Sequence, residues 1–523
     1  MATEAQIVPS RIASINPATG EVLREFDCAG EAEVRAAVAR ARAAQPGWNA
    51  LGISARNDVL RRFQQVLQKR KSDVAHLITR EAGKPVGEAL VTEVVVALDA
   101  TRFCIQNAPA VLRSERLHYG NPAMRATTGR ILHEPWGVVG IIAPWNYPFS
   151  IPASEMVAAL AMGNAVVLKP SEFTPLCAIE LVGLLSAAGL PQGVVEVVVG
   201  DGGTGAALLA SNIDKIIFTG SVATGKRVAA AAAARLLPAV LELGGKDPMI
   251  VLEDADVNVA SSGAIWGAFV NAGQTCLSVE RCYVVRRHYE RFAALCAEKA
   301  AKLRVGNGLD ANTDVGPLIH ERQLQVVEEQ VNDALARGAR LLAGGKRLPE
   351  LGANFYAPTV LADVNHSMRI MREETFGPVL PIMAVADEAE AVRLANDSEF
   401  GLAASVWTGN TVRGERIAAQ LQAGTVMIND AVTCFGISEA PHGGVKSSGL
   451  GRTHGRAGLE EMVRPKFVDS DALGRVRRPW WYGYGPGFEA QMAGFADWLF
   501  ARGISSRVKG ALKSSGAMLR KKL

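Results

Sequence analysis

The spacing of apolar residues divides the first half of the chain into two kinds of pattern. Residues 31–118 contain long stretches such as EAEVRAAVARARAA, in which apolar positions recur every three or four residues. This spacing predicts amphipathic helices. From about residue 137, short apolar runs such as VVGIIAP and AVVLKP alternate with helical patterns. Strands that alternate with helices in this way predict a parallel sheet with right-handed crossovers.

A second alternating series begins near residue 247 and continues to about 440. The sequence therefore predicts two α/β units joined near residue 243, and the Gly-rich segment 443–455 is predicted to be a loop. Ligands of parallel sheets bind beyond the carboxyl ends of the strands. The polar residues at or just after the ends of the first apolar runs are therefore candidates for a site: Asn146, Lys169, Ser221 and Glu242.

Length and composition narrow the class of protein. A chain of 523 residues is too long for one core, and 49% apolar with 21% charged residues is typical of α/β proteins. No apolar run reaches the ~18 residues that span a bilayer, and the N-terminus lacks the pattern of a signal peptide. The seven cysteines form no CxxC pair, so neither a disulfide framework nor a metal site is expected. A cytoplasmic protein is predicted.

The net charge of +4 is unevenly distributed. Residues 471–523 contain ten Lys or Arg against three Asp or Glu, and three of the eight tryptophans. The rest of the chain is slightly acidic, so no general nucleic-acid surface is expected. Apolar and basic residues at helical spacing in this extension suit a helix on a membrane surface, or equally a helix packed on a sister subunit.

Two Gly-rich segments follow predicted strands. GDGGTG at 200–205 matches the dinucleotide fingerprint G-x-G-x-x-G, but the acidic residue expected ~20 positions later is missing, which favours a tight turn. FTGSVATGK at 218–226 opens a helix, and Ser221 could either help to hold a phosphate or cap the helix. Glu242, taken alone, is either a surface charge or a carboxylate held in a cleft.

Cys276 lies among small polar residues, in FVNAGQTCLSVE at 269–280. Three interpretations are open: an inert core thiol, the nucleophile of a hydrolase, or a nucleophile toward another electrophilic carbon. A Cys-His hydrolase would need an activating imidazole. The eight histidines are scattered along the chain, and none lies in a recognisable partner motif.

Seven motifs, taken in order and spacing, resemble the aldehyde dehydrogenase superfamily over roughly residues 12–470. They are PWNYP (144–148), VVLKPSE (166–172), FTGS (218–221), LELGGKDP (241–248), GQTC (273–276), EETFGP (373–378) and SSGLGR (447–452). The segment after Cys276 and the extension past residue 470 resemble the succinate-semialdehyde dehydrogenase-like branch. Many relatives have a glutamate at the position of Arg464, so no role is inferred for that residue.

The resemblance implies NAD(P)-dependent oxidation of an aliphatic or aromatic aldehyde to the carboxylic acid. Cys276 matches the nucleophile that forms a thiohemiacetal and then a thioester, and Asn146 matches the amide of the oxyanion hole. Glu242 matches the base that activates water for deacylation. Its presence favours hydrolysis over transfer of the acyl group to coenzyme A. A cofactor-free thiol esterase and a binding protein on the same fold are the alternatives.

The resemblance also implies cofactor and substrate contacts. Lys169 and Glu172 match residues that hold the adenosine ribose, and the carboxylate favours NAD over NADP, which is possible as well. Glu374 and Phe376 match contacts of the nicotinamide ribose and ring, and Ser221 matches a pyrophosphate contact. Further cofactor positions are Trp145, Gly220 and Gly225. The expected substrate tunnel consists of Tyr147, Ile151, Thr275, Leu277 and Phe435. Its apolar character makes succinate semialdehyde the second choice of substrate.

The fold implied is α/β, with a Rossmann-like cofactor domain, an α/β catalytic domain and a small β element for oligomerisation. The expected boundaries are 1–118 with 138–242 for NAD binding, 243–445 for catalysis, 119–137 with 446–470 for bridging, and 471–523 for the extension. Members of the family form dimers or tetramers, so a homodimer or homotetramer is expected. A membrane contact is expected, if anywhere, in the extension.

Overall fold

The computed structural model describes residues 11–121, 124, 127–472, 474, 478, 480–482 and 484–518. The remaining positions, in the expected cofactor, bridging and C-terminal segments, lie outside the described residues. The chain divides into two compact units. The first comprises Met1–Val111 and Pro135–Arg464, and the second comprises Leu112–Glu134 and Pro465–Leu523.

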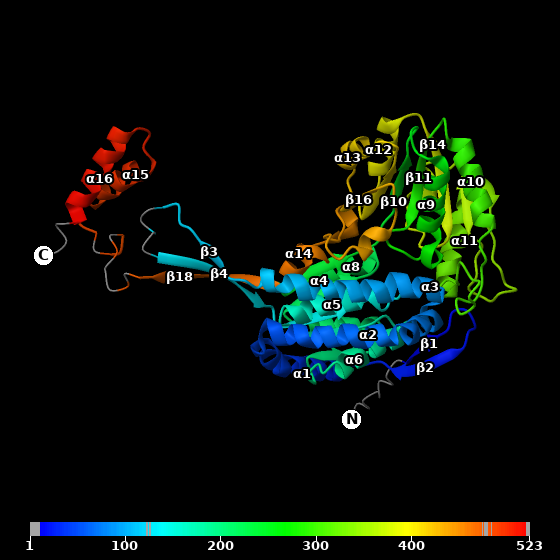
Figure 1. The fold of residues 1–523 in the computed structure, drawn as a ribbon, viewed down its shortest axis with the longest axis horizontal. Coiled ribbons are helices and arrows are strands. Elements are labelled where there is room, and N and C mark those ends of the chain that lie inside the picture. The colour runs from blue at the N-terminus through cyan, green and yellow to red at the C-terminus, as the bar shows by residue number, and fades with distance from the viewer. Residues whose placement is uncertain are drawn as a thin grey trace, which may run out of the picture. The chain divides into compact units, whose positions relative to one another are not determined.

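A six-stranded sheet in the first unit has the order β17-β9-β8-β5-β6-β7, parallel except for β17. The strands are β5 (Val138–Ile142), β6 (Ala165–Lys169), β7 (Val195–Val197), β8 (Lys215–Thr219), β9 (Ala239–Glu242) and β17 (Gly449–Leu450). The helices of this part are α1 (Glu31–Ala50), α2 (Gly52–Ala82), α4 (Val96–Val111), α5 (Ser150–Ala161), α6 (Pro175–Ala187), α7 (Gly202–Ala210), α8 (Val222–Ala234) and α14 (Gly455–Glu461). Helix α2 packs against α4 and α6, and α4 packs against α5 (Figure 1).

A seven-stranded sheet follows in the same unit, in the order β12-β13-β14-β11-β10-β15-β16, with only β12 antiparallel. Its strands are β10 (Asp247–Val251), β11 (Val279–Val285), β12 (Arg340–Ala343), β13 (Thr359–Ala362), β14 (Val379–Val385), β15 (Ala403–Trp407) and β16 (Thr425–Ile428). Its helices are α9 (Val257–Phe269), α10 (Tyr289–Ala301), α11 (Glu321–Ala336), α12 (Glu388–Asn396) and α13 (Thr411–Ala418). A hairpin of β1 (Arg11–Ile15) and β2 (Val22–Asp27) precedes both sheets.

Central strands of both sheets are buried along their whole length, as β5, β6 and β10 are. Strands covered by helices on both faces need continuous apolar runs, which is the pattern seen in the sequence. The prediction of an α/β fold with parallel sheets is thus confirmed. Because β9 ends at Glu242 and β10 begins at Asp247, the chain passes from one sheet to the other where the sequence predicted the junction.

The Gly-rich segment 443–455 is not simply a loop, so that prediction was wrong in part. Its residues Gly449–Leu450 form β17, which pairs antiparallel with β9 at Glu242 and Leu241. The backbone N–H of Leu243 also donates to the Ser448 carbonyl at 2.9 Å. Since this pairing needs only backbone groups, the apolar pattern did not reveal it.

The second unit contains a three-stranded sheet in the order β18-β4-β3 and a pair of helices. The elements are β3 (Glu115–Leu117), β4 (Thr127–Pro135), β18 (Val463–Asp471), α15 (Phe488–Phe500) and α16 (Ile504–Met518). Residues 446–464, expected in the bridging element, belong to the first unit instead. Over the described residues, the helices are too short or too polar to cross a bilayer.

Candidate active site

Cys276 follows an unusual turn at the end of α9. Asn271, Ala272 and Gly273 all have positive φ angles, of 54°, 55° and 73°. Such values are uncommon outside glycine, and they persist where the surroundings fix the backbone. Gly273 meets the backbone of Gly377 so closely that a Cβ atom there would overlap it. The turn therefore holds the backbone in front of Cys276 in one conformation.

Asn146 is held next to this turn by both its backbone and its side chain. Its Nδ2 donates to the Gln274 carbonyl at 3.0 Å, and its own carbonyl accepts from Asn271 Nδ2 at 2.9 Å. Lys84 Nζ, which is buried, also donates to that carbonyl at 2.7 Å and pairs with Glu93 at 2.6 Å. An amide nitrogen carries two hydrogens, so Asn146 has a second donor besides the one bonded to Gln274.

Glu242 ends β9 and its carboxylate is buried. Among the described residues neither carboxylate oxygen has a hydrogen-bond partner, and His442 Nε2 lies 3.8 Å from Oε2. Burial, and after it the charge of Glu155, raise the pKa of Glu242 well above its ordinary value. The interpretation of Glu242 as a surface charge is thus excluded, since the side chain lies inside the molecule.

The environment of Cys276 favours the neutral thiol. Burial first, and then the carboxylates of Asp247, Glu374 and Glu242, raise its pKa well above 9.0. A thiolate is the reactive form of cysteine, so this thiol needs a base or a positive charge at the moment of reaction.

The five expected tunnel residues all line one cavity that ends at Cys276. Its volume is about 590 Å³. Tyr147 is fixed in the wall by a 2.8 Å hydrogen bond between its hydroxyl and Thr275 Oγ1. Val91, Val95, Trp266 and Ile437 also line this cavity, and all four are exposed. This first cavity is therefore an apolar channel with an apolar rim.

Three charged groups beyond the expected set also line this channel. Arg102, on α4, lies 2.8 Å from Asp99 and 2.7 Å from Glu439, and both carboxylates line the channel as well. Arg102 could not be predicted from the sequence, because it comes 174 positions before Cys276 on a helix with no motif. The arginine charge is already paired twice.

A second cavity, with a volume of about 230 Å³, also reaches Cys276. It is lined by Trp145, Gly220, Ser221, Glu374 and Phe376 from the expected cofactor set, together with Asn146 and Glu242. Trp145 and Phe376 meet edge to face with ring centroids 5.3 Å apart. The Gly245 N–H donates to Glu374 Oε1 at 3.0 Å, and burial raises the pKa of Glu374 to about 8.

Three residues of the expected cofactor set do not line this second cavity. Lys169 and Glu172 form a separate pair beyond β6, with Nζ 3.5 Å from Oε2. Gly225 lies in α8, where its missing side chain lets the helix pack against Leu243. Ser221 is the N-cap of α8, and its Oγ accepts from the Thr224 N–H at 3.3 Å. Both interpretations of Ser221 are thus compatible, as it caps a helix whose N-terminus faces the cavity.

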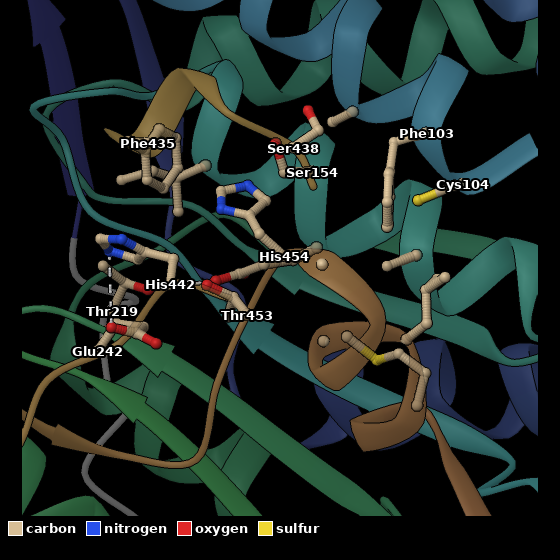
Figure 2. Close-up of a pocket in the computed structure, with 18 of the residues that line it drawn as sticks. Phe103, Cys104, Ser154, Thr219, Glu242, Phe435, Ser438, His442, Thr453 and His454 are labelled. Carbon is tan, nitrogen blue, oxygen red and sulfur yellow. Dashed lines mark hydrogen bonds and ion pairs between the residues drawn. The ribbon is translucent and has the colours of Figure 1, made fainter. Parts of the chain in front are cut away.

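A third and much smaller cavity lies behind Glu242, with a volume of about 40 Å³. Figure 2 shows the His442 ring directed toward Glu242, with Thr453, His454 and Ser154 around the same space. The pKa of His442 is lowered to about 3 and that of His454 to about 4, in both cases mainly by burial. Both imidazoles are therefore neutral near pH 7. Burial raises the pKa of Glu155, which also lines this cavity, to about 8.

The sequence did not predict that these two histidines lie together, and the reason is structural. His442 and Thr453 form an antiparallel bridge, with backbone hydrogen bonds of 2.7 and 2.8 Å. The Gly-rich segment between them folds back, so His442 and His454 arrive together beside Phe435. The available sequence signal was their position, with His442 directly before the Gly-rich segment and His454 near its end.

Comparison with known proteins agrees with this geometry. The model of the aldehyde dehydrogenase family matches residues 3–468, nearly the whole chain. The chain belongs to the aldehyde dehydrogenase family. It is 40% identical over 489 residues to a 4,4'-diapolycopene aldehyde oxidase of Methylomonas sp, covering 94% of this chain and 91% of that protein. It is 41% identical to a putative succinate-semialdehyde dehydrogenase [NADP(+)] of Mycolicibacterium smegmatis, covering 86% and 87%.

Solved structures lead to the same family. An NAD+ complex of aldehyde dehydrogenase from Bacillus cereus has a TM-score of 0.85 and 36% identity, covering 88% of this chain and 94% of that one. The resemblance predicted from the seven motifs is confirmed. The protein is an aldehyde dehydrogenase, an oxidoreductase of the aldehyde group in a family whose members use NAD or NADP.

Proposed function

We propose that Cys276 is the nucleophile of this aldehyde dehydrogenase. It lines both the aldehyde channel and the second cavity, and the one other described residue that does so, Ile151, is apolar. This junction is the observation that carries the proposal. The thiolate attacks the aldehyde carbon and forms a thiohemiacetal. Because its surroundings disfavour the thiolate, a base must take the thiol proton. Glu242 shares the second cavity with Cys276, and we assign it to the later step, deacylation.

Asn146 stabilises the negative oxygen that develops on the aldehyde. Asn146 and Cys276 both line the second cavity, and the Cys276 backbone N–H would be the second donor. NAD, when bound, would supply the acceptor for the hydride that leaves the adduct. Loss of the hydride turns the thiohemiacetal into a thioester on Cys276.

Glu242 then takes a proton from water, whose oxygen attacks the thioester carbon. The C–S bond breaks, the sulfur of Cys276 leaves as thiolate, and the carboxylic acid is released. Among the described residues neither carboxylate oxygen of Glu242 has a hydrogen-bond partner, which supports this role because the oxygens can bond water. The test is Glu242→Gln: the first hydride burst should persist in rapid mixing with an aldehyde, while turnover stalls. Loss of the burst together with turnover would contradict the deacylation role.

The residues of the second cavity fit a dinucleotide. The N-terminus of α8 has N–H groups without partners inside the helix, which suit a pyrophosphate. Glu374 would hold the nicotinamide ribose, and Trp145 with Phe376 would border the ring. Lys169 and Glu172 would hold the adenosine ribose, with Gly220 at the pyrophosphate. Gly225 would contribute only by letting α8 pack against Leu243. The carboxylate of Glu172 would repel a 2′-phosphate, so we propose a preference for NAD.

We propose a long, apolar aldehyde as the substrate. The channel is wide, and its rim of Val91, Val95, Trp266 and Ile437 exposes apolar surface to solvent. Exposed apolar surface of this kind marks a binding site. The Methylomonas relative, named as an oxidase of a diapolycopene aldehyde, covers nearly the whole chain and agrees with this choice.

Succinate semialdehyde is the second candidate, suggested by the mycobacterial relative. Its distal carboxylate would need an unpaired cation in the channel. Arg102 is there, but Asp99 and Glu439 neutralise it and leave an excess of negative charge. The deciding measurement is kcat/KM for dodecanal against succinate semialdehyde. A higher value for the semialdehyde would contradict the apolar substrate.

We propose that the protein is a cytoplasmic homodimer or homotetramer. The strands β3 and β18 are the two edges of the small sheet in the second unit, and edge strands offer unpaired backbone groups to another chain. An aldehyde of the proposed kind dissolves in lipid, so we also propose that residues 471–523 contact a membrane.

A further inference from the structure

The C-terminal hairpin, defined as α15 and α16 with the turn between them, is held together by small and polar groups. A methyl group at Gly494 would lie 2.9 Å from the Gly510 carbonyl oxygen, so the two helices touch at these glycines. Gln491 and Ser514 are buried beside them, and Gln491 Nε2 donates to the Ser514 carbonyl at 3.5 Å. The contact between the helices therefore involves little apolar side chain at these positions.

Large apolar side chains lie on the outside of the hairpin. Ile504, Val508 and Leu512 follow one another at intervals of four residues on α16 and are 84%, 52% and 67% exposed. Phe500, at the end of α15, is 77% exposed. A helix pair that folds in water turns its apolar stripe inward. In lipid, by contrast, helices meet through small residues and turn large apolar side chains outward.

Basic residues accompany this apolar stripe. Arg507, Lys509 and Lys513 lie on the same helix and are exposed. The last 26 residues of the sequence, 498–523, contain seven Lys or Arg and no Asp or Glu. This composition matches the negative charge of anionic headgroups. A sister subunit whose second unit carries the same positive charge would be a poorer partner for it.

Aromatic residues before the hairpin agree with a lipid partner. Trp481, Tyr482 and Tyr484 are all exposed. Rings with one polar end prefer the boundary between water and hydrocarbon. The helices have 13 and 15 residues, fewer than the ~20 needed to span a bilayer, so they would lie along the surface.

We propose that the C-terminal hairpin is a peripheral membrane anchor for anionic bilayers. Ile504, Val508 and Leu512, with Phe500, enter the interface between headgroups and acyl chains. Arg507, Lys509 and Lys513 contact anionic headgroups on either side of the stripe. The anchor concerns binding alone and does not depend on the chemistry proposed for Cys276.

Co-sedimentation of the full-length protein with vesicles tests this anchor, without aldehyde or cofactor. The protein should pellet with phosphatidylcholine vesicles that contain phosphatidylglycerol, much less with phosphatidylcholine alone, and less as salt is raised. A protein that stays in the supernatant with both kinds of vesicle at low salt would overturn the proposal.

A triple variant, Ile504→Ser with Val508→Ser and Leu512→Ser, isolates the stripe while it keeps every charge. Its partition onto anionic vesicles should fall by about tenfold or more. The matched control is Leu236→Ser with Val412→Ser, which removes exposed apolar side chains from the first unit and should leave pelleting unchanged. Light scattering gives the oligomeric state of each variant. Unchanged pelleting of the triple variant would overturn the anchor. If its oligomeric state changed at the same time, the stripe would be assigned to a sister subunit.

Discussion

The imidazole of His442 lies 3.8 Å from the carboxylate of Glu242, and both side chains are buried. A charged histidine would form an ion pair and keep Glu242 ionised. Because the pKa of His442 is lowered to about 3, the ring is neutral and gives no such help. The protonation of Glu242 is therefore set by burial and by its acidic neighbour, Glu155.

The first prediction concerns the pH dependence of turnover. A base works only when it is deprotonated, and the pKa of Glu242 is raised well above its ordinary value. Where deacylation limits turnover, kcat should therefore rise with pH through neutrality. Steady-state kcat from pH 5 to 10, measured beside the hydride burst, checks this. A kcat that is flat over that range would contradict the raised pKa.

The second prediction concerns Glu155, whose charge is the second cause of that raised pKa. Glu155→Gln removes the repulsion, so the rise of kcat should move to lower pH. The groups that face Glu242 and Glu155 within this part of the molecule are Cys276, His442, Arg452 and His454. Ser154→Ala is the control, because it changes the lining of the same cavity without a charge and should leave the profile in place.

The third prediction concerns substrate choice at the mouth of the channel. Glu439→Ala removes one of the two carboxylates on Arg102 and frees part of its charge for a ligand. The ratio of kcat/KM for succinate semialdehyde to that for butanal should rise, by about tenfold if one ion pair is gained. Asp73→Asn, in an exposed pair with Arg70, is the control and should leave the ratio unaltered. An unchanged ratio in the Glu439 variant would contradict a role of Arg102 in substrate choice.

The fourth prediction concerns the cofactor. Glu172→Gln removes the negative charge that would repel a 2′-phosphate but keeps Lys169 nearby. The kcat/KM for NADP should rise relative to that for NAD, by roughly tenfold, or ~1.4 kcal/mol. Initial rates with both cofactors and one aldehyde provide the measurement. An enzyme that already uses NADP better than NAD would contradict the assigned role of Glu172.

The fifth prediction concerns stability. Lys84 and Glu93 form a buried pair that also holds the Asn146 carbonyl. Lys84→Met leaves the Glu93 charge buried without its partner, which costs ~3–5 kcal/mol of the free energy of unfolding. Lys302→Met, in an exposed pair with Glu298, should cost no more than ~1 kcal/mol. Chemical denaturation of both variants checks this, and equal losses would show that Lys84 is not structurally important.

The sequence predicted much of this site because strand ends and motifs coincide. Asn146 and Glu242 follow apolar runs, and parallel strands bring such residues to one edge of the sheet. Cys276 could be placed near them only through the resemblance, since it lies outside both series of strand ends and the strand after it, β11, belongs to the other sheet.

The rest of the site depends on contacts that no local pattern encodes. Arg102 reaches the channel through the packing of α4, and His442 through the backbone bridge to Thr453. Gly225 shows the converse, because its motif suggested a cofactor contact and its position shows a packing role against Leu243. Periodicity predicts which face of an element is buried, but not which distant side chain meets it.

The separate routes to Cys276 have a kinetic consequence. The channel and the second cavity share only Ile151 and Cys276 in their linings, so neither reactant has to pass through the space of the other. An apolar blocker of the channel should leave dinucleotide affinity intact and inhibit noncompetitively toward it. The carboxylic acid can leave before the reduced cofactor or after it. The slower of the two dissociation steps then limits the rate of product release.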